Sequence, residues 1–323
     1  MMDLREAARQ DEVRRRSAGD EPSREFLERA FQRVRATLDS PKPPPVWTPS
    51  LEQLTVSRRK LDDDIEQRIR PKLPDTLPPE DEADVDNLFS KRGTIAKFAR
   101  EQVTDRDIAR LRPNQWLNDE IINFYGQLLL ARSEAAVQAA TKTRALNGIN
   151  GVNRNTKKSK PLDVHYFSTF FWSKLTGEGY EKGRLSRWTK RFDIFSKDVL
   201  LIPVNHNNMH WTGAAVNFRR KRIESYDSMG SKNKHVFQVI RSYLNDEHKS
   251  KKKTPFDFTD WVDYTLPDTP QQENGYDCGV FTCQFLETLS RGEETFNFTQ
   301  KNIKYLRRRM VWEIAHTQLR DEH

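Results

Sequence analysis

The chain has 323 residues, of which 35% are hydrophobic and 32% are charged, so it can bury a core and still present a large polar surface. No segment approaches the ~20 consecutive apolar residues of a membrane-spanning helix, and the first residues lack the apolar stretch of a secretory signal. The two cysteines are too few for a disulfide-rich secreted domain. We therefore expect an intracellular protein without membrane insertion.

Charge is divided unevenly along the chain. Residues 1–90 carry 16 Lys and Arg against 20 Asp and Glu, whereas residues 91–323 carry 39 against 27, a net charge of +12. A basic domain favours an acidic partner, which can be a protein or a nucleic acid. Basic tracts at 157–160, 219–222 and 249–253 resemble nuclear-import signals, although such runs are more often solvated loops. Because RNP, zinc-finger and helix-turn-helix signatures are lacking, we expect a protein partner rather than a nucleic acid. We expect a location in the nucleus or at its periphery, with the cytoplasm as the alternative.

Residues 1–90 lack the pattern of a packed domain. Amphipathic helices are predicted at 23–38 and 51–69, and clusters of proline and acidic residues separate and follow them. Such clusters are typical of linkers and disordered tails. We expect residues 1–90 to form an N-terminal extension that is largely disordered or helical, and residues 91–323 to form the folded domain.

From about residue 95 the sequence has the hydrophobic patterns of a folded domain. A strongly apolar helix is predicted at about 117–131, and the small, polar and basic residues at about 135–160 are interpreted as a surface loop. An aromatic-rich segment at 164–175 is predicted to be buried. Strands are predicted at 199–204, 210–218 and 222–228, with a hairpin turn at 219–221 between the last two.

The remaining elements complete an α+β pattern. Helices are predicted at about 233–245 and 299–319, with a short strand near residues 261–266. Strands thus cluster in the middle of the domain and helices lie at both ends of it. This order predicts an α+β fold rather than a parallel α/β sheet.

The segment "PQQENGYDCGVF" at 270–281 places a cysteine in an unusual setting. Gly275 permits a sharp turn, and Asp277 is suited to cap a helix whose apolar residues follow at helical spacing. In the first turn of that helix, unpaired N–H groups and the helix dipole favour a thiolate. Cys278 is therefore a candidate nucleophile. Cys283, in the middle of the apolar stripe, is interpreted as a core residue.

A cysteine nucleophile needs a base, an orienting acid and an oxyanion donor. Among the seven histidines, His210 begins a predicted strand, and Asp227 ends the strand that is paired with it. The hairpin brings these two positions roughly opposite each other at its open end. The sequence therefore predicts an imidazole and a carboxylate side by side, as a His–Asp pair requires.

Four motifs together resemble those of the ubiquitin-like-protein-specific proteases, the SUMO-deconjugating cysteine peptidases. They are "WLNDEIINFY" at 116–125, "HW" at 210–211, the strand-end Asp227, and "QENGYDCG" at 272–279, in the family's order. The similarity spans about residues 95–320. It implies a papain-like fold with a central mixed sheet flanked by helices and a triad in the order His, Asp, Cys.

The resemblance also implies a role for each matching residue. His210 would be the general base, Asp227 its orienting acid and Cys278 the nucleophile. Gln272 matches the oxyanion-hole glutamine and would act with the backbone N–H of Cys278. Gln271, its neighbour, is the alternative. No zinc, nucleotide or flavin motif is present in the sequence, so we expect no cofactor.

The implied partners are SUMO or a SUMO-like modifier and its conjugates. These enzymes cut after a diglycine tail, both in the modifier precursor and at isopeptide bonds to lysines of target proteins. Trp116 and Trp211 match the two walls of the tunnel that admits glycine, and Asp119 matches a carboxylate that pairs with a basic residue near the base of the tail. Whether the basic segment at about 135–160 touches the substrate or blocks it stays open.

Three other interpretations remain open. In the first, the chain is a protease for a different ubiquitin-like modifier. In the second, it is an acyltransferase of a related fold, and in the third, it is a modifier receptor without catalytic activity. The intact set of Cys278, His210, Asp227 and Gln272 argues against the receptor, because binding alone does not require all four residues.

Overall fold

The computed structural model describes residues 9–14, 24–39, 50, 53–58, 61, 72–150, 162–231 and 233–320, with side chains up to 142 in the long helix. The chain separates into two compact units, residues 1–61 and 62–323. In the first, α2 (Arg24–Asp39) is the helix predicted at 23–38, and none of its residues is buried. Of the helix predicted at 51–69, residues 53–58 and 61 are helical, and the others lie outside the described residues.

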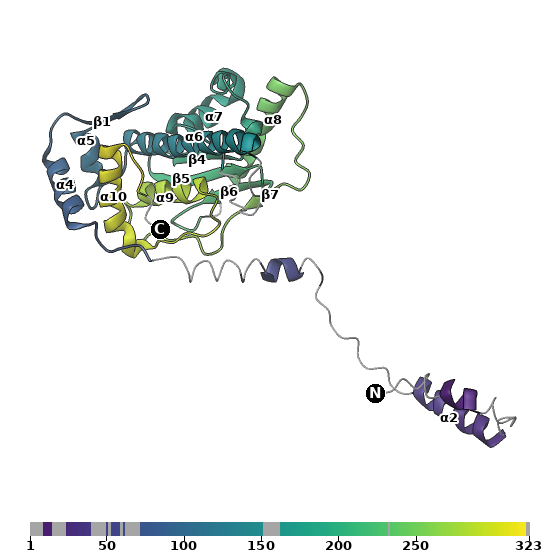
Figure 1. The fold of residues 1–323 in the computed structure, drawn as a ribbon. Helices are drawn as coiled ribbons and strands as arrows, with labels where there is room; N and C mark the ends of the chain where they lie inside the picture. The colour runs from purple at the N-terminus through teal and green to yellow at the C-terminus, as the bar shows by residue number, and fades with distance from the viewer. Residues whose placement is uncertain are drawn as a thin grey trace. The chain divides into compact units, whose positions relative to one another are not determined.

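A five-stranded mixed sheet lies at the centre of the second unit, in the order β3-β4-β5-β6-β7 (Figure 1). Its strands are β3 (Val164–Tyr166), β4 (Val199–His206), β5 (His210–Asn217), β6 (Arg222–Tyr226) and β7 (Val262–Tyr264). The pairs β4–β5 and β5–β6 are antiparallel, whereas β3–β4 and β6–β7 are parallel. The sheet confirms the predicted strands and the α+β class.

Helices cover both faces of the sheet. They are α6 (Asp119–Asn150), α7 (Thr169–Lys182), α8 (Lys234–Lys252), α9 (Cys278–Ser290) and α10 (Ile303–His316). The sheet lies between two hydrophobic cores, and the side chains of β4 enter them alternately, because successive side chains of a strand point to opposite faces. Leu201 lies in the core with α6, α9 and α10, whereas Leu200 and Ile202 lie in the core with α7 and α8. Figure 1 shows α7 and α8 next to each other.

Smaller elements complete the unit. They are α4 (Pro79–Ser90), β1 (Thr94–Phe98), β2 (Glu101–Thr104), α5 (Asp105–Ile108), η1 (Ala109–Leu111), η2 (Leu185–Arg187), η3 (Ile194–Ser196) and η4 (Gln300–Asn302). Helix α4 precedes residue 91 and packs on α10: Val85 is fully buried, and Asp86 accepts a hydrogen bond from Arg308 at 2.7 Å.

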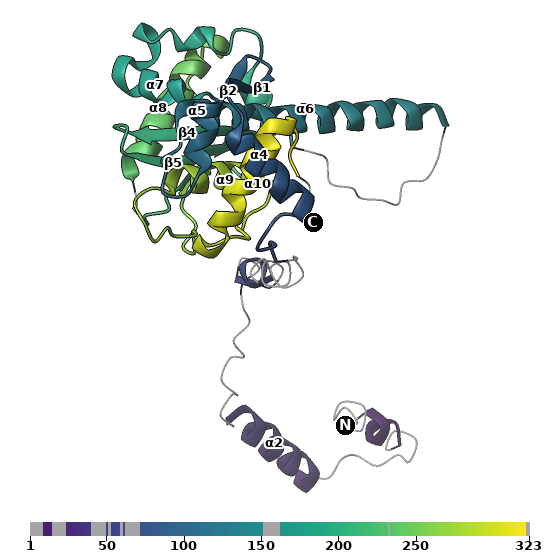
Figure 2. The same ribbon diagram turned by 90° about the vertical axis from the view of Figure 1, so that its left-hand side faces the viewer.

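Two helices are longer than predicted. Helix α6 continues to Asn150, so the loop interpretation of residues 135–150 is wrong, and residues 151–161 lie outside the described residues. The sequence beyond residue 134 is rich in alanine, which has the highest helix propensity, but its small, polar and basic residues had suggested a surface loop. Figure 2 shows α6 extending past the other helices. Helix α8 likewise continues through the lysine run to Lys252. Among the described residues, no helix is both long and apolar enough to span a bilayer.

Candidate active site

The histidine and aspartate expected to pair lie side by side at the open end of the β5–β6 hairpin. The outermost pair of that ladder joins Gly213 to Tyr226, so residues 210 and 227 come together just beyond it. His210 Nε2 lies 2.7 Å from Asp227 Oδ1, and both side chains are mostly buried. The backbone N–H of Met229 donates to the same oxygen at 2.8 Å. This second contact holds the carboxylate in the position from which it orients the imidazole.

One ring nitrogen of His210 remains available. With Nε2 against Asp227, Nδ1 is buried and makes no hydrogen bond to any residue that the structure describes. Burial lowers the pKa of His210, but its interactions with Asp227 and Cys278 outweigh burial and raise this pKa to about 9. His210 can therefore accept a proton from a thiol and hold it at neutral pH.

Cys278 is the first residue of α9, which is buried along its whole length and packs on β5 and α6. The structure confirms the predicted place of this cysteine in the first turn, where free N–H groups and the helix dipole favour a negative charge. Gly279 follows it because a Cβ there would lie 2.8 Å from Cβ of Leu117. The start of α9 therefore docks closely against the segment that carries Trp116.

Asp277 occupies the N-cap position of α9, but its side chain makes no capping hydrogen bond. The expected capping role is wrong. The buried carboxylate instead accepts hydrogen bonds from Arg307 Nη2 at 2.6 Å and Nε at 3.0 Å. Charge-assisted hydrogen bonds are stronger than those to neutral amides, which explains why the carboxylate turns away from the helix.

Cys283 lies inside the core, and 2% of it is exposed. Burial raises the pKa of its thiol, and the charge of Glu313 adds to the effect. A thiol that stays protonated is a poor nucleophile. The core interpretation of Cys283 is therefore confirmed.

The two neighbouring glutamines differ in what their amides contact. Gln272 accepts a hydrogen bond from Ser228 Oγ at 2.6 Å, and its Nε2 donates to the carbonyl of Asn274. Gln271 Nε2 donates to two carbonyls, those of Asp227 at 3.2 Å and Thr269 at 2.8 Å. Both N–H groups of Gln271 are therefore occupied, whereas Gln272 keeps one N–H that no described group binds. Gln272 therefore has an N–H left to donate, and its role as the oxyanion donor stays a prediction.

The residues expected to bind the substrate differ in exposure. Trp116 is 41% exposed just before α6, whereas Trp211 is 5% exposed and packs in the core. Asp119 begins α6, is partly buried, and forms no ion pair with any described residue. The structure thus brings Trp116 to the surface and leaves Asp119 unpaired, while most of the Trp211 ring is covered. The tunnel itself stays a prediction.

A sequence model of the Ulp1 protease family, C-terminal catalytic domain, matches residues 115–320. The chain belongs to this family. The expectation drawn from the four sequence motifs is confirmed at the level of the family.

Relatives of this Ulp1-family chain carry protease names. It is 42% identical over 218 residues to the sentrin-specific protease of Caenorhabditis elegans, which covers 68% of this chain and 28% of that protein. It is 36% identical over 220 residues to human sentrin-specific protease 2, covering 68% of this chain and 33% of that protein. The chain therefore spans about a third of the length of these curated relatives.

Solved structures of the Ulp1 family share the fold. A structure of the SUMO protease Ulp1 with its catalytic cysteine oxidised to a sulfenic acid has a TM-score of 0.60 at 23% identity, covering 77% of this chain and 99% of that one. The C-terminal Ulp1 protease domain in complex with Smt3, the yeast ortholog of SUMO, has a TM-score of 0.58 at 24% identity, covering 76% and 98%. These matches confirm the papain-like α+β fold.

Sequence reasoning on this Ulp1-family chain missed Arg307, although a signal was present. Arg307 lies four residues after Ile303 and three before Met310, on the apolar face of α10, and all three side chains are buried. A charge on an apolar stripe predicts a buried partner. That partner, Asp277, could not be identified because it lies 30 residues away in sequence.

Among the described residues, no cluster of histidine, cysteine and acidic side chains is arranged to hold a metal.

Proposed function

We propose that this chain is a cysteine protease that hydrolyses the bond after the C-terminal diglycine of SUMO. Its substrates are the SUMO precursor and the isopeptide conjugates of SUMO with lysines of target proteins. The observation that carries the proposal is the 2.7 Å contact between His210 and Asp227, at the open end of a hairpin that packs on the helix beginning with Cys278. Membership of the Ulp1 family and the names of the relatives support the substrate class.

The residues have complementary roles in the acylation half of the reaction. His210 Nδ1 takes the proton of the Cys278 thiol, and Asp227 on Nε2 fixes the tautomer and supports the positive ring. The thiolate attacks the carbonyl carbon of the terminal glycine. The oxygen becomes negatively charged and accepts hydrogen bonds from the backbone N–H of Cys278 and the side-chain amide of Gln272.

Deacylation regenerates the enzyme. When the tetrahedral intermediate collapses, the C–N bond breaks, and His210 gives its proton to the leaving amine, which is lysine Nζ in a conjugate. The glycine is then bound to Cys278 as a thioester. His210 next removes a proton from water, and the hydroxide attacks the thioester. The glycine carboxylate leaves, and the returned proton restores the thiol.

Three residues account for substrate selection in this proposal. Trp116, with its exposed ring, and Trp211, next to His210, form walls that leave no room for a β-carbon in the tail. Asp119, which is unpaired among the described residues, is available to a basic residue near the base of that tail. We further propose that residues 91–323, together with α4, which packs on α10, are the catalytic domain, that the residues before α4 are an extension, and that the protein acts in the nucleus.

Covalent capture tests the function directly. The protein is incubated with SUMO that carries a C-terminal electrophile in place of the last carboxylate, and the adduct is mapped by mass spectrometry. We expect one SUMO per chain, on the peptide that contains Cys278. Capture by ubiquitin or another diglycine modifier in preference to SUMO supports the alternative protease. Failure to react with any modifier, together with transfer of an acyl group from a thioester donor, supports the acyltransferase and overturns the proposal.

A further inference from the structure

Two segments that lead to candidate site residues meet at one buried side chain, Arg307 of α10. The candidate residues are Trp116, Gln272 and Cys278. Residues 110–115 lead to Trp116, and residues 274–277 lead from Gln272 to Cys278. We propose that Arg307 is a positioning residue that holds the nucleophile, the oxyanion amide and the tunnel wall in register. The inference rests on the proposed function and concerns a group that does not touch the substrate.

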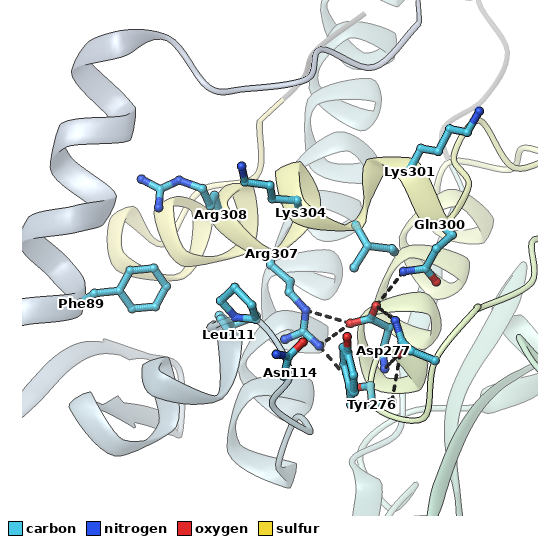
Figure 3. Close-up of a pocket in the computed structure, with 13 residues that line it drawn as sticks. Phe89, Leu111, Asn114, Tyr276, Asp277, Gln300, Lys301, Lys304, Arg307 and Arg308 are labelled. Atoms are coloured by element: carbon cyan, nitrogen blue, oxygen red, sulfur yellow. Dashed lines mark hydrogen bonds and ion pairs between the residues drawn. The ribbon is translucent and has the colours of Figure 1, made fainter.

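The first contact of Arg307 is with the residue before the nucleophile. Arg307 Nε and Nη2 both donate to Asp277 Oδ1, at 3.0 and 2.6 Å (Figure 3). The two side chains are 4% and 3% exposed. An ion pair this deeply buried adds little net stability, because the loss of hydration offsets the attraction. What the pair supplies is a fixed position for Asp277, and through it for Cys278.

The other donors of Arg307 reach the backbone. They bind four carbonyls at 2.9 to 3.3 Å, those of Arg110, Arg112, Gln115 and Tyr276. Gln115 directly precedes Trp116. A guanidinium is planar and has five N–H groups in a rigid fork, so it fixes the direction of each carbonyl as well as its distance. The ammonium of lysine, with three donors on one atom, lacks this geometry.

Asp277 extends the constraint to the oxyanion amide. Its second oxygen accepts hydrogen bonds from Asn274 Nδ2 at 2.7 Å and Gln300 Nε2 at 2.8 Å. Asn274 Oδ1 accepts the backbone N–H of Asp277 at 3.1 Å, and the carbonyl of Asn274 accepts the amide of Gln272. Gln272 is thus tied through one residue to the Arg307–Asp277 pair.

A pocket of about 330 Å³ lies against the pair and is lined by Arg307, Asp277, Tyr276, Ile303 and Leu111 among others (Figure 3). It gives a small cation a route to the space that a truncated Arg307 leaves. Chemical rescue can therefore separate the guanidinium group from the packing of the arginine stem on α10.

The experiment uses the full chain with Arg307→Lys, Arg307→Ala and the matched control Arg308→Lys. Arg308 is the next residue of α10 and pairs with Glu82 and Asp86 of α4 instead. For each variant we would measure kcat and KM on a SUMO substrate with a C-terminal fluorophore, and Tm. The alkylation rate of Cys278 by iodoacetamide from pH 5 to 9 provides a readout that needs no modifier.

We expect Arg307→Lys to lower kcat by about 10- to 100-fold with KM nearly unchanged, since misplacement of about 1 Å costs on the order of 10²-fold. The pH dependence of its alkylation should differ from that of the wild type, because the thiol and the His210 imidazole no longer keep their relative positions. Millimolar ethylguanidinium should restore part of the kcat of Arg307→Ala and nothing in Arg308→Lys. The control should stay within about twofold of the wild type.

Two results overturn the inference. One is a wild-type kcat in folded Arg307→Lys. The other is a loss that follows Tm alone, with the alkylation profile unchanged. If the Arg307 variants do not fold, Gln300→Ala removes one donor to Asp277 from the half-buried edge, and an unchanged kcat and profile there contradict the inference. A wild type that alkylates normally but does not cleave SUMO rejects the proposed function and leaves alkylation to decide the role of Arg307.

Discussion

His210 and Asp227 face each other across the open end of the β5–β6 hairpin, with Nε2 of the imidazole 2.7 Å from Oδ1 of the carboxylate. His210 begins β5 and Asp227 directly follows β6, while Cys278 begins the helix packed on β5. Rigid elements hold a site more accurately than loops do. The consequences of this arrangement can be measured one residue at a time.

Asp227→Asn should leave the fold intact and lower kcat strongly. The carboxylate sets the tautomer of His210 and supports its positive charge, an effect worth up to about 10⁴-fold in serine-protease triads. We expect a smaller loss here, because a thiol is far more acidic than a serine hydroxyl and depends less on the base for its activation. The measurement is kcat on a SUMO fluorophore substrate from pH 5 to 10. A pH–rate profile equal to that of the wild type would contradict the pairing.

The same pair predicts how stability depends on pH. The pKa of His210 is raised to about 9 in the folded protein, from about 6.5 in an unfolded chain. The folded state binds this proton more tightly, so the stabilisation is complete below pH ~6.5 and is lost as the pH rises through ~9. Urea unfolding of the wild type and Asp227→Asn should show their difference in unfolding free energy shrinking over this window. A difference that grows with pH would show that the sign is wrong.

The two cysteines should respond oppositely to substitution. Cys278→Ser should abolish cleavage and keep SUMO binding, because a hydroxyl is too weakly acidic for an imidazole matched to a thiol. Cys283→Ser should keep the chemistry and lose stability, by about 1–3 kcal/mol, because it buries a hydroxyl in the core. Cleavage assays and thermal melts on both variants decide the matter. An inactive Cys283→Ser that melts normally would reverse the two assignments.

What could be predicted from the sequence was local. The hairpin that joins His210 to Asp227 follows from strand periodicity and one turn, and the place of Cys278 follows from a glycine-bearing turn before an apolar run. Gln272 was preferred to Gln271 only because of the resemblance, and this choice stays a prediction, although the structure shows that Gln271 Nε2 donates to two carbonyls.

What could not be predicted depended on distant contacts. Asp277 has the residue type and position of a helix cap, but Arg307 of α10 competes for its carboxylate. Helix α4 appeared as part of an acidic, proline-rich tail, yet Val85 is buried, and Asp86 accepts a hydrogen bond from Arg308. Propensity and pattern contain no information on such partners, because the pairing exists only once the fold has formed.

Gly279→Ala should destabilise the start of α9. Its added Cβ would lie 2.8 Å from Cβ of Leu117, which is too close for a carbon contact. Overpacking of this kind costs typically about 1–3 kcal/mol. Because the strain acts next to Cys278, kcat should fall along with Tm. Leu117→Gly removes the contacted Cβ, so the losses that Gly279→Ala causes in Tm and kcat should be smaller in a Leu117→Gly chain than in the wild type. If the double variant is worse than the sum of its parts, the contact is not the cause.

The two tryptophans should separate substrate selection from stability. Trp116 is 41% exposed, whereas Trp211 is 5% exposed within the core. Trp116→Ala should therefore keep Tm near that of the wild type, whereas Trp211→Ala should lose about 3–5 kcal/mol of stability. If the rings wall a tunnel for glycine, removing either one frees space beside the tail. Both variants should then accept a Gly-Ala tail at a kcat/KM closer to that for Gly-Gly.

The comparison needs both tails in all three proteins, at a temperature where Trp211→Ala remains folded. A Gly-Gly to Gly-Ala ratio of kcat/KM that falls in Trp116→Ala alone would leave Trp211 as a core residue beside the site. This outcome agrees with its low exposure. A ratio unchanged in both variants would remove the tunnel from the mechanism.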